Sequence, residues 1–314
     1  IYFIQNLIVS DNLYVSEYAI RQPHHSAFMR PFAWSSHGSC IVSHDKVILT
    51  SDTKSQKGSI WHSKPIEYHN WQIVVDFKVH GAANSLYGDG FAFWYTKEHS
   101  NEGPVFGSKD YFRGLGIIFD TYSNLQEVNN FLHPYISAQI NDGSVHYNQD
   151  TDGRNSELSG CHYNFRLGSH SAIITYYGFN STLMLNILNL ETNLMTFCFL
   201  TDGVELPTGY HVGFSAATGD LSDNHEILSV EFYNLDAVLE LKYRPNEFHN
   251  IIPKASHSKL HNKEYKGAKG KSSFWVFVRR FSIFLLLLSI SAIVLTAVFY
   301  FLNKREKQRR KRFY

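Results

Sequence analysis

The chain has 314 residues, a length that fits one or two domains and allows a sizeable core. Aromatic residues make up 15% of it, a share more typical of a large β-rich core than of a helical one. The formal net charge of +1 is uneven, because the last twelve residues hold seven Lys and Arg against one Glu. The remainder is therefore acidic, which argues against a nucleic-acid-binding domain.

Residues 1–12 form a separate segment whose origin the sequence leaves open. The chain does not begin with Met, so "IYFIQNLIV" is either the remnant of a signal peptide or the edge of a fragment. A cleaved signal peptide is the expectation for a lumenal domain that precedes a single membrane span.

Residues 13–234 show no sustained helical period, and strand patterns recur instead. The clearest is "WQIVVDFKV" at 71–79, where apolar and polar side chains alternate. "GFAFWYT" at 90–96 and "GLGIIFD" at 114–120 are nearly continuous apolar runs, as expected for strands covered on both faces.

Alternation returns in the second half of this region. It is present in "LMLNIL" at 183–188 and in "ILSVEFY", where we expect Leu228, Val230 and Phe232 to share one face. Turn signals separate the strands: "NDG" at 141–143, "TDG" at 151–153 and 201–203, and "PTG" at 207–209. Many short strands with this spacing predict an all-β antiparallel sandwich or jelly roll.

The end of the chain has three distinct compositions. Residues 235–280 are polar and rich in Lys, His and Asn, which predicts a stalk or linker. Residues 281–302 are 22 uncharged, mostly apolar residues, long enough for one transmembrane helix. Residues 303–314 are a basic tail, "NKREKQRRKRFY", that we place in the cytosol. The positive-inside rule favours this orientation only weakly, because basic residues also precede the span.

Two further features agree with a lumenal location for the β-rich region. "NST" at Asn180 is an acceptor sequence for N-glycosylation. Cys161 and Cys198 could pair in an oxidising compartment, which would leave Cys40 unpaired.

Two acidic motifs lie at the ends of predicted strands. "GDG" places Asp89 between two glycines directly before an apolar strand. "FDTYSN" offers Asp120, Asn124 and the carbonyl of Tyr122 from one short loop, and all three are hard oxygen donors of the kind that Ca²⁺ requires. A third side chain could come from "QDTDGR", through Asp150 or Asp152. The alternative is an ordinary polar turn in which Asp and Asn satisfy the backbone.

The order of motifs between residues 14 and 234 resembles the animal L-type (legume-like) lectins of the early secretory pathway. The resemblance is carried by "GDGFAFWYT", "GPVFGSKD", "GLGIIFDTYSN", "HPYIS", "NDGSVHY" and "ATGDLSDNH", and it resumes at the terminal "KRFY". It implies a legume-lectin-like jelly-roll sandwich of two sheets. It also implies that Cys161 and Cys198 form the single disulfide of the family.

The resemblance further implies a bound Ca²⁺ and a mannose site next to it. The metal ligands would be Asp120, the carbonyl of Tyr122, Asn124 and Asp152. Sugar contacts would come from Ser55, Asp89, Asn124, Gln149, Gly219, Asp220 and Leu221. In this scheme Asp89 accepts hydrogen bonds from two sugar hydroxyls, and its glycine neighbours permit the close approach that this requires.

Gln149 is a departure from the family pattern, which has a histidine shortly before the third calcium aspartate. Glutamine can donate and accept hydrogen bonds, so sugar contact is expected to survive. The ring contact of histidine and its titration near neutral pH would be lost, and any pH-dependent release that uses this ring would be blunted. His146 lies nearby in the sequence, but its direction is open.

Three functional classes follow. The first is a Ca²⁺-dependent lectin, not an enzyme, that binds high-mannose N-glycans as a cargo receptor or quality-control lectin between ER and Golgi. The second is a trafficking adaptor that kept the lectin fold and lost sugar binding. The third is a membrane-tethered glycosidase, which needs a pair of carboxylates flanking the scissile bond. No acidic pair of the form E-x-D-x-E is present on one strand, which disfavours the third class.

The basic tail has the features of a sorting signal. Arg310, Lys311 and Arg312 resemble an arginine-type retrieval signal, and the terminal Phe313 and Tyr314 resemble an ER exit signal recognised by vesicle coats. We therefore expect a single-pass type I membrane protein of the ER, the ER–Golgi intermediate compartment and the Golgi. Its expected partners are high-mannose glycoproteins and coat components, and the sequence leaves self-association open.

Overall fold

The computed structural model describes most of the β-rich region, namely residues 11–30, 33–100, 102–124, 132–166, 168–237 and 247–256. The chain divides into two compact units, Ile1–Lys259 and Leu260–Tyr314, and every described residue belongs to the first. Within these ranges no helix is both long and apolar enough to cross a membrane. The predicted span at 281–302 and the sorting residues at 310–314 lie outside the described residues.

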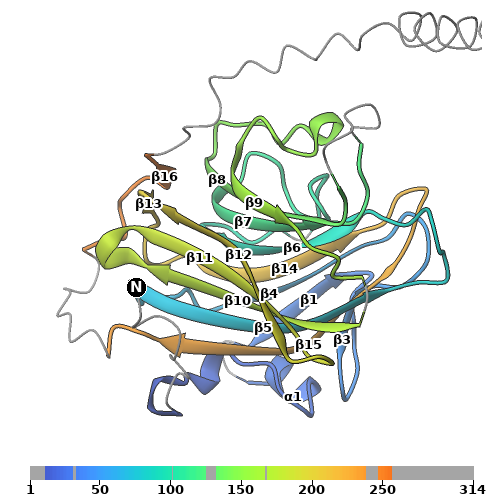
Figure 1. The fold of residues 1–314 in the computed structure, drawn as a ribbon. Coiled ribbons are helices and arrows are strands. Elements are labelled where there is room, and N and C mark those ends of the chain that lie inside the picture. The colour runs from blue at the N-terminus through green and yellow to red at the C-terminus, as the bar shows by residue number, and fades with distance from the viewer. Residues whose placement is uncertain are drawn as a thin grey trace, which may run out of the picture. The chain divides into compact units, whose positions relative to one another are not determined.

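Two seven-stranded antiparallel sheets stack face to face (Figure 1). The first sheet has the strand order β1 (Trp34–Gly38), β4 (Lys57–His62), β14 (His211–Ala217), β6 (Gly90–Thr96), β7 (Arg113–Asp120), β8 (Tyr135–Asp142) and β9 (Glu157–His162). The second has the order β12 (Leu194–Asp202), β11 (Thr182–Asn189), β10 (Ser169–Tyr177), β5 (Asn70–His80), β15 (Asn224–Asn234), β3 (Val47–Thr50) and β2 (Ile41–Val42). The predicted all-β sandwich is confirmed.

Helical structure in the described residues is confined to short segments. They are α1 (His25–Phe28) and the 3₁₀ turns η1 (Asp11–Leu13), η2 (Ser16–Tyr18), η3 (Gln149–Thr151) and η4 (Gly178–Asn180). The η3 turn carries Gln149 and leads directly into Asp152, two of the predicted site residues.

The main core lies between the two sheets, and β5 contributes to it as its alternation predicts. The alternate apolar residues of β5, namely Trp71, Ile73, Val75, Phe77 and Val79, are all 2% exposed or less, whereas Val74, Asp76 and Lys78 are partly exposed. A second cluster covers the outer face of β6 and β7 and includes Trp94, Phe106 and Tyr147. These two strands therefore read as continuous apolar runs because both of their faces are buried.

The predicted buried face of β15 is wrong at Leu228. In β15 the register with β5 shifts between Ile227 and Ser229, so that Ile227 is buried with Val230 and Phe232 while Leu228 is partly exposed. A β-bulge adds one residue to one strand, which interrupts the period of two on which the prediction depended.

The C-terminal part of the β-domain extends beyond residue 234. β16 (Lys254–Ala255) pairs with β13 (Val204–Glu205), and the ring of Phe248 stacks on His69 with centroids 3.7 Å apart. Residues 247–256, which the composition assigned to the stalk, thus pack against the sandwich.

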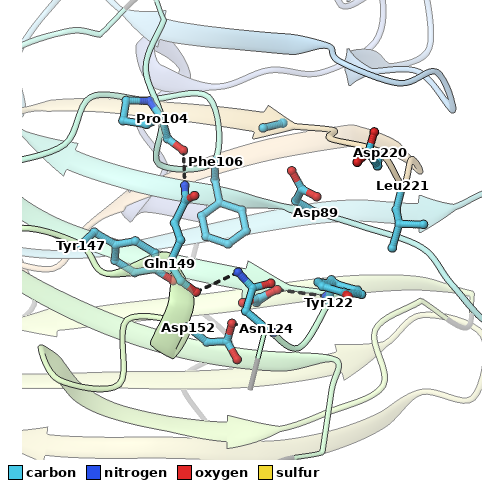
Figure 2. A pocket seen from close by; sticks show the side chains of 12 residues that line it. Asp89, Pro104, Phe106, Tyr122, Asn124, Tyr147, Gln149, Asp152, Asp220 and Leu221 are labelled. Atoms are coloured by element: carbon cyan, nitrogen blue, oxygen red, sulfur yellow. Dashed lines mark hydrogen bonds between the residues drawn. The ribbon is translucent and has the colours of Figure 1, made fainter. Parts of the chain in front are cut away.

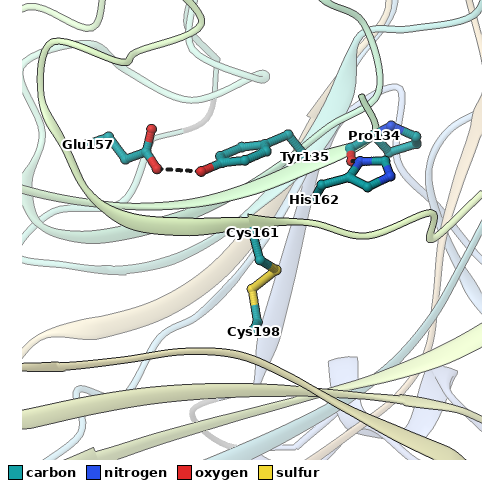
Figure 3. Close-up of a disulfide and its surroundings, with 6 residues drawn as sticks. All are labelled: Pro134, Tyr135, Glu157, Cys161, His162 and Cys198. Carbon is teal, nitrogen blue, oxygen red and sulfur yellow. Dashed lines mark hydrogen bonds between the residues drawn. A yellow bond between two sulfur atoms is a disulfide. The ribbon is translucent and has the colours of Figure 1, made fainter. Parts of the chain in front are cut away.

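The disulfide between Cys161 and Cys198 is confirmed (Figure 3). Cys161 lies on β9 and Cys198 on β12, the edge strands of the two sheets, so the bond joins the sheets at one side. Cys40 is a free thiol, and burial raises its pKa to about 12. It is therefore uncharged at neutral pH and a poor nucleophile.

Candidate functional site

A pocket of about 310 Å³ lies where β6, β7 and β14 end and the loops that follow or precede them meet (Figure 2). It is lined by Asp89, Pro104, Phe106, Asp120, Tyr122, Asn124, Tyr147, Gln149, Asp152, Ala217, Asp220 and Leu221. Eight of these residues are among the predicted metal and sugar contacts. The fold therefore gathers positions that are more than 130 residues apart in the sequence.

The backbone of Asp89 is fixed from both sides, because it directly precedes the central strand β6. Its N–H donates to the carbonyl of Ala217 at 3.2 Å, and its carbonyl accepts from the N–H of Thr121 at 3.0 Å. Gly90 has a φ of +149°, and a Cβ there would lie 2.2 Å from the carbonyl oxygen of Phe119. Only glycine fits this position, so the motif is explained by close packing of β6 on β7.

The Asp89 carboxyl is half-buried, and burial raises its pKa to about 6. The nearby Asp220 raises it further, and the backbone N–H of Gly219 opposes the shift. Gly219 lies close to this carboxyl, since a Cβ at residue 219 would be 3.3 Å from both of its oxygens. The carboxylate is thus partly desolvated, and it can accept hydrogen bonds from a ligand.

The loop after β7 and the η3 segment are tied together by hydrogen bonds. The N–H of Asn124 donates to Asp152 Oδ1 at 3.0 Å, and Asn124 Nδ2 donates to the carbonyl of Gln149 at 2.8 Å. Within the first loop, the N–H of Tyr122 donates to Asp120 Oδ1 at 3.0 Å. Asp152 has a φ of +49°, which turns the chain after η3 toward the loop.

Asp120 and Asp152 converge on a third side chain, His133. Its Nε2 atom lies 3.7 Å from Asp120 Oδ2 and 3.6 Å from Asp152 Oδ2, and one ligand atom of each group lies within 4.8 Å of the others. Burial raises the pKa of Asp120 to about 6; the facing His133 opposes this shift and the charge of Asp152 adds to it. Two buried carboxylates in this arrangement are the elements of a cation site.

The sequence analysis missed His133. The signal was its place two residues before β8, the antiparallel neighbour of β7. Because Tyr135 pairs with Asp120, the residues just before Tyr135 must lie at the same end of the sheet as the acidic loop.

The remaining predicted contacts lie at or near the pocket. The N–H of Ser55 donates to the carbonyl of Gly219 at 3.1 Å, which places this exposed residue beside the 219–221 loop but outside the lining. The side chain of Gln149 donates to the carbonyl of Pro104. Of the two acidic candidates in the η3 segment, Asp152 lines the pocket and the exposed Asp150 does not.

Two further positions, the nearby His146 and the glycosylation acceptor Asn180, lie away from the pocket. His146 contacts Asp110, its side chain is 60% exposed, and it is not part of the lining, so it does not replace the ring expected near residue 149. Asn180 is exposed in η4, the turn between β10 and β11, where a glycan could be attached without disturbing the core.

Comparison with known proteins shows the family of the chain. Residues 12–240 match the Legume-like lectin family. The chain belongs to this family. This legume-like lectin is 44% identical to the vesicular integral-membrane protein VIP36 of Mus musculus over 205 residues, which are 64% of the chain and 56% of that relative. It thus spans little more than half the length of that relative. It is 36% identical over 291 residues to the human VIP36-like protein, covering 90% of the chain and 80% of the relative.

Solved structures of the exoplasmic/lumenal domain of VIP36 have the same fold. The Ca²⁺/Man2-bound form matches this legume-like lectin with a TM-score of 0.72 and 37% identity, over 78% of the chain and 99% of that domain. The same domain is known with Ca²⁺ and Man3GlcNAc bound and in a metal-free form. The VIP36 domain, which has this sandwich, is thus known with Ca²⁺ and with mannose-containing glycans bound.

Proposed function

We propose that this protein is a Ca²⁺-dependent lectin that binds high-mannose N-glycans. The observation that carries the proposal is the position of Asp89, whose half-buried carboxyl shares one pocket with Asn124, Asp220 and Leu221, beside a buried pair of aspartates. A mannose ring needs such an arrangement of acceptors and donors at one small site. The Ca²⁺- and mannose-bound structures of the VIP36 domain support the same reading.

The metal ligands in this proposal are Asp120, the carbonyl of Tyr122, Asn124 and Asp152. The donor set fits Ca²⁺, which takes six to eight oxygen ligands and commonly uses carboxylates and carbonyls, with water completing the shell. Asn124 Nδ2 is engaged by the carbonyl of Gln149, which leaves the amide oxygen as the metal donor. The ion would neutralise two buried carboxylates and hold the 120–124 loop against the η3 segment.

The sugar contacts follow from the positions around Asp89. Its carboxylate would accept hydrogen bonds from two hydroxyls of one mannose, and Asn124 would contribute from the metal side. Gly219, Asp220 and Leu221 would offer backbone and side-chain groups, and the Tyr122 ring would cover an apolar face of the sugar. Ser55, at the edge of the pocket, and Gln149 would contact the next residues of the glycan arm.

Such a shallow polar site predicts weak binding per glycan, with avidity from several glycans or several copies of the chain. We further propose that the domain is lumenal and attached by the span at 281–302 to a cytosolic tail that binds vesicle coats. In this role the protein would sort or monitor glycoproteins between the ER and the Golgi. The names of its relatives, which include a vesicular integral-membrane protein, agree with this location.

The main alternative is an adaptor with a lectin fold that binds no sugar. Gln149 favours it, because its amide is engaged by Pro104 and offers no ring to a ligand. We propose no enzymatic activity, since Asp89 and Asp120 are assigned to sugar and metal and the matched relatives are lectins.

A glycan-binding assay on residues 1–259 tests the proposal. We expect high-mannose glycans to bind in Ca²⁺, to be released by EDTA, and to be lost in Asp89→Ala. Asp150→Ala is the matched control, because Asp150 is an exposed acid in the neighbouring loop that does not line the pocket. Absence of binding by a folded wild-type domain would leave the adaptor as the better description.

A further inference from the structure

His133 is a buried imidazole at the predicted cation site, and its ring lies beside that of Tyr135. Its side chain is only 7% exposed, and neither ring nitrogen has a hydrogen-bond partner among the described residues. Buried polar atoms in native proteins are nearly always paired, because an unpaired one keeps its desolvation penalty without a compensating hydrogen bond. A buried histidine whose Nε2 faces two carboxylates therefore indicates a ligand between them.

The distances fit a small divalent ion at that place. The separations of 3.6 and 3.7 Å between Nε2 and the two Oδ2 atoms are too long for hydrogen bonds. With metal–ligand bonds of about 2.0–2.2 Å, donors this far apart subtend roughly 110–130° at the ion, near the angles of a tetrahedral site. Both separations between His133 and a carboxylate already have this value, with the three side chains placed by β7, the segment preceding β8 and the end of η3.

The nitrogen donor decides which ion is favoured. Ca²⁺ is bound in proteins through oxygen, whereas imidazole suits Zn²⁺ and related first-row ions. Zn²⁺ takes both imidazole nitrogen and Asp or Glu oxygen as ligands, and a water can complete a four-coordinate site. An all-oxygen loop would favour Ca²⁺ alone, and His133 adds a donor that Ca²⁺ rarely uses.

We propose that His133 makes this a mixed nitrogen–oxygen site, in which its Nε2 atom and the carboxylates of Asp120 and Asp152 bind Zn²⁺. Because both aspartates also belong to the proposed Ca²⁺ site, the two ions compete. Zn²⁺ would take Asp152 through Oδ2, the oxygen that faces His133, while Oδ1 of the same carboxylate accepts from the N–H of Asn124. The inference depends on the cation site at these aspartates and does not require that sugar be bound.

Metal binding to the full 314-residue chain in mild detergent, without a histidine tag, tests this inference. Zn²⁺ affinity is measured by competition with a chromophoric chelator, and Ca²⁺ affinity by titration calorimetry. Co²⁺, whose visible absorption reports nitrogen and oxygen coordination, is a spectroscopic probe of the same site. The variants are His133→Phe, which removes the donor, and Asp120→Asn, which weakens the site for both ions. His146→Phe is the matched control, because His146 lies outside the pocket.

We expect one Zn²⁺ to bind the wild-type chain and to reduce its apparent Ca²⁺ affinity. Loss of a histidine that only supports a ligand typically weakens metal binding 10–100-fold, so loss of a direct ligand should weaken Zn²⁺ by at least about 100-fold. His133→Phe should therefore lose Zn²⁺ and its Co²⁺ spectrum while it keeps Ca²⁺, and His146→Phe should behave as wild type. If His133→Phe does not fold, His133→Gln serves in its place and is expected to give the same loss.

Equal Zn²⁺ binding by the wild type and the His133 variants would overturn the inference, as would a wild-type chain that binds Ca²⁺ and no Zn²⁺. The second result leaves the proposed lectin intact. Zn²⁺ bound through His133 without any glycan binding supports the metal inference and rejects the lectin. The two proposals therefore fail separately.

Discussion

Replacing Asp89 with asparagine distinguishes the contribution of this carboxylate to ligand binding from its effect on the free energy of unfolding. Burial raises the pKa of Asp89 from 3.8 to about 6. Each pKa unit corresponds to about 1.4 kcal/mol, so ionised Asp89 destabilises the folded state at pH 7 by at most about 3 kcal/mol. Because the side chain is only half-buried, solvent screening reduces this figure. We expect Asp89→Asn to raise the free energy of unfolding by about 1–2 kcal/mol.

The gain should depend on pH in a defined direction. Below pH 3.8 the carboxyl is protonated in both the folded and the unfolded chain, and the substitution changes little. Between pH 3.8 and about 6 the unfolded chain is ionised while the folded one retains its proton, so the wild type loses stability as the pH rises. Above about pH 6 both states are ionised and the gain is constant.

Urea unfolding of residues 1–259 in EDTA, at pH 7 and at pH 4, measures this difference. The same variant should lose mannose binding in Ca²⁺, because an amide presents one acceptor where the carboxylate presents two. Asp150→Asn, an exposed acid in the neighbouring loop, should change neither property. An Asp89→Asn domain that is no more stable than wild type at pH 7 would refute the reasoning that burial destabilises this carboxylate.

Three other expectations follow from the same structure. Mannose binding at saturating Ca²⁺ should weaken by up to about tenfold between pH 7.5 and pH 5, because Asp89 must be ionised to accept two hydroxyls and the bound cation lowers its pKa below the metal-free value of about 6. Calorimetry that shows no change would contradict this. Replacing both Cys161 and Cys198 by serine should lower the free energy of unfolding by about 3–4 kcal/mol. This is the loop-closure entropy expected for a sequence separation of 37, and chemical denaturation under non-reducing conditions measures it. Gly90→Ala should destabilise the domain by about 2 kcal/mol or more and abolish glycan binding, because the alanine Cβ would clash with the carbonyl oxygen of Phe119. A variant with the unfolding curve and glycan binding of the wild type would contradict this expectation.

Periodicity predicted the strands well wherever one face is buried and the ladder is regular. The alternation in β5 survives in the fold because that strand pairs with β10 on one side and β15 on the other, with a regular register to β10. It failed in β15, because the bulge at Leu228 depends on pairing with a strand that is distant in the sequence. Local patterns contain no information about such a partner.

The acidic half of the site was predictable because family motifs carry it, and His133 was not. Its role depends on the register between β7 and β8, which sets His133 at the same end of the sheet as Asp120. Composition was similarly a poor guide to where the domain ends. Residues 247–256 are polar enough for a linker, yet Phe248 stacks on His69 and β16 completes a small sheet.

The sugar and metal halves of the pocket differ in how firmly they are held, and this predicts how they respond to loss of the ion. Asp89 precedes the central strand and is hydrogen-bonded to chain segments on both sides, so its position does not depend on a cation. Asn124, by contrast, is positioned through Asp152 and the carbonyl of Gln149, both on the η3 segment. Because Asp120 and Asp152 are like charges buried side by side, removing the cation leaves their repulsion to act on the contacts that orient Asn124. In the proposed lectin, calcium dependence of binding would therefore arise from Asn124, while Asp89 would remain in place.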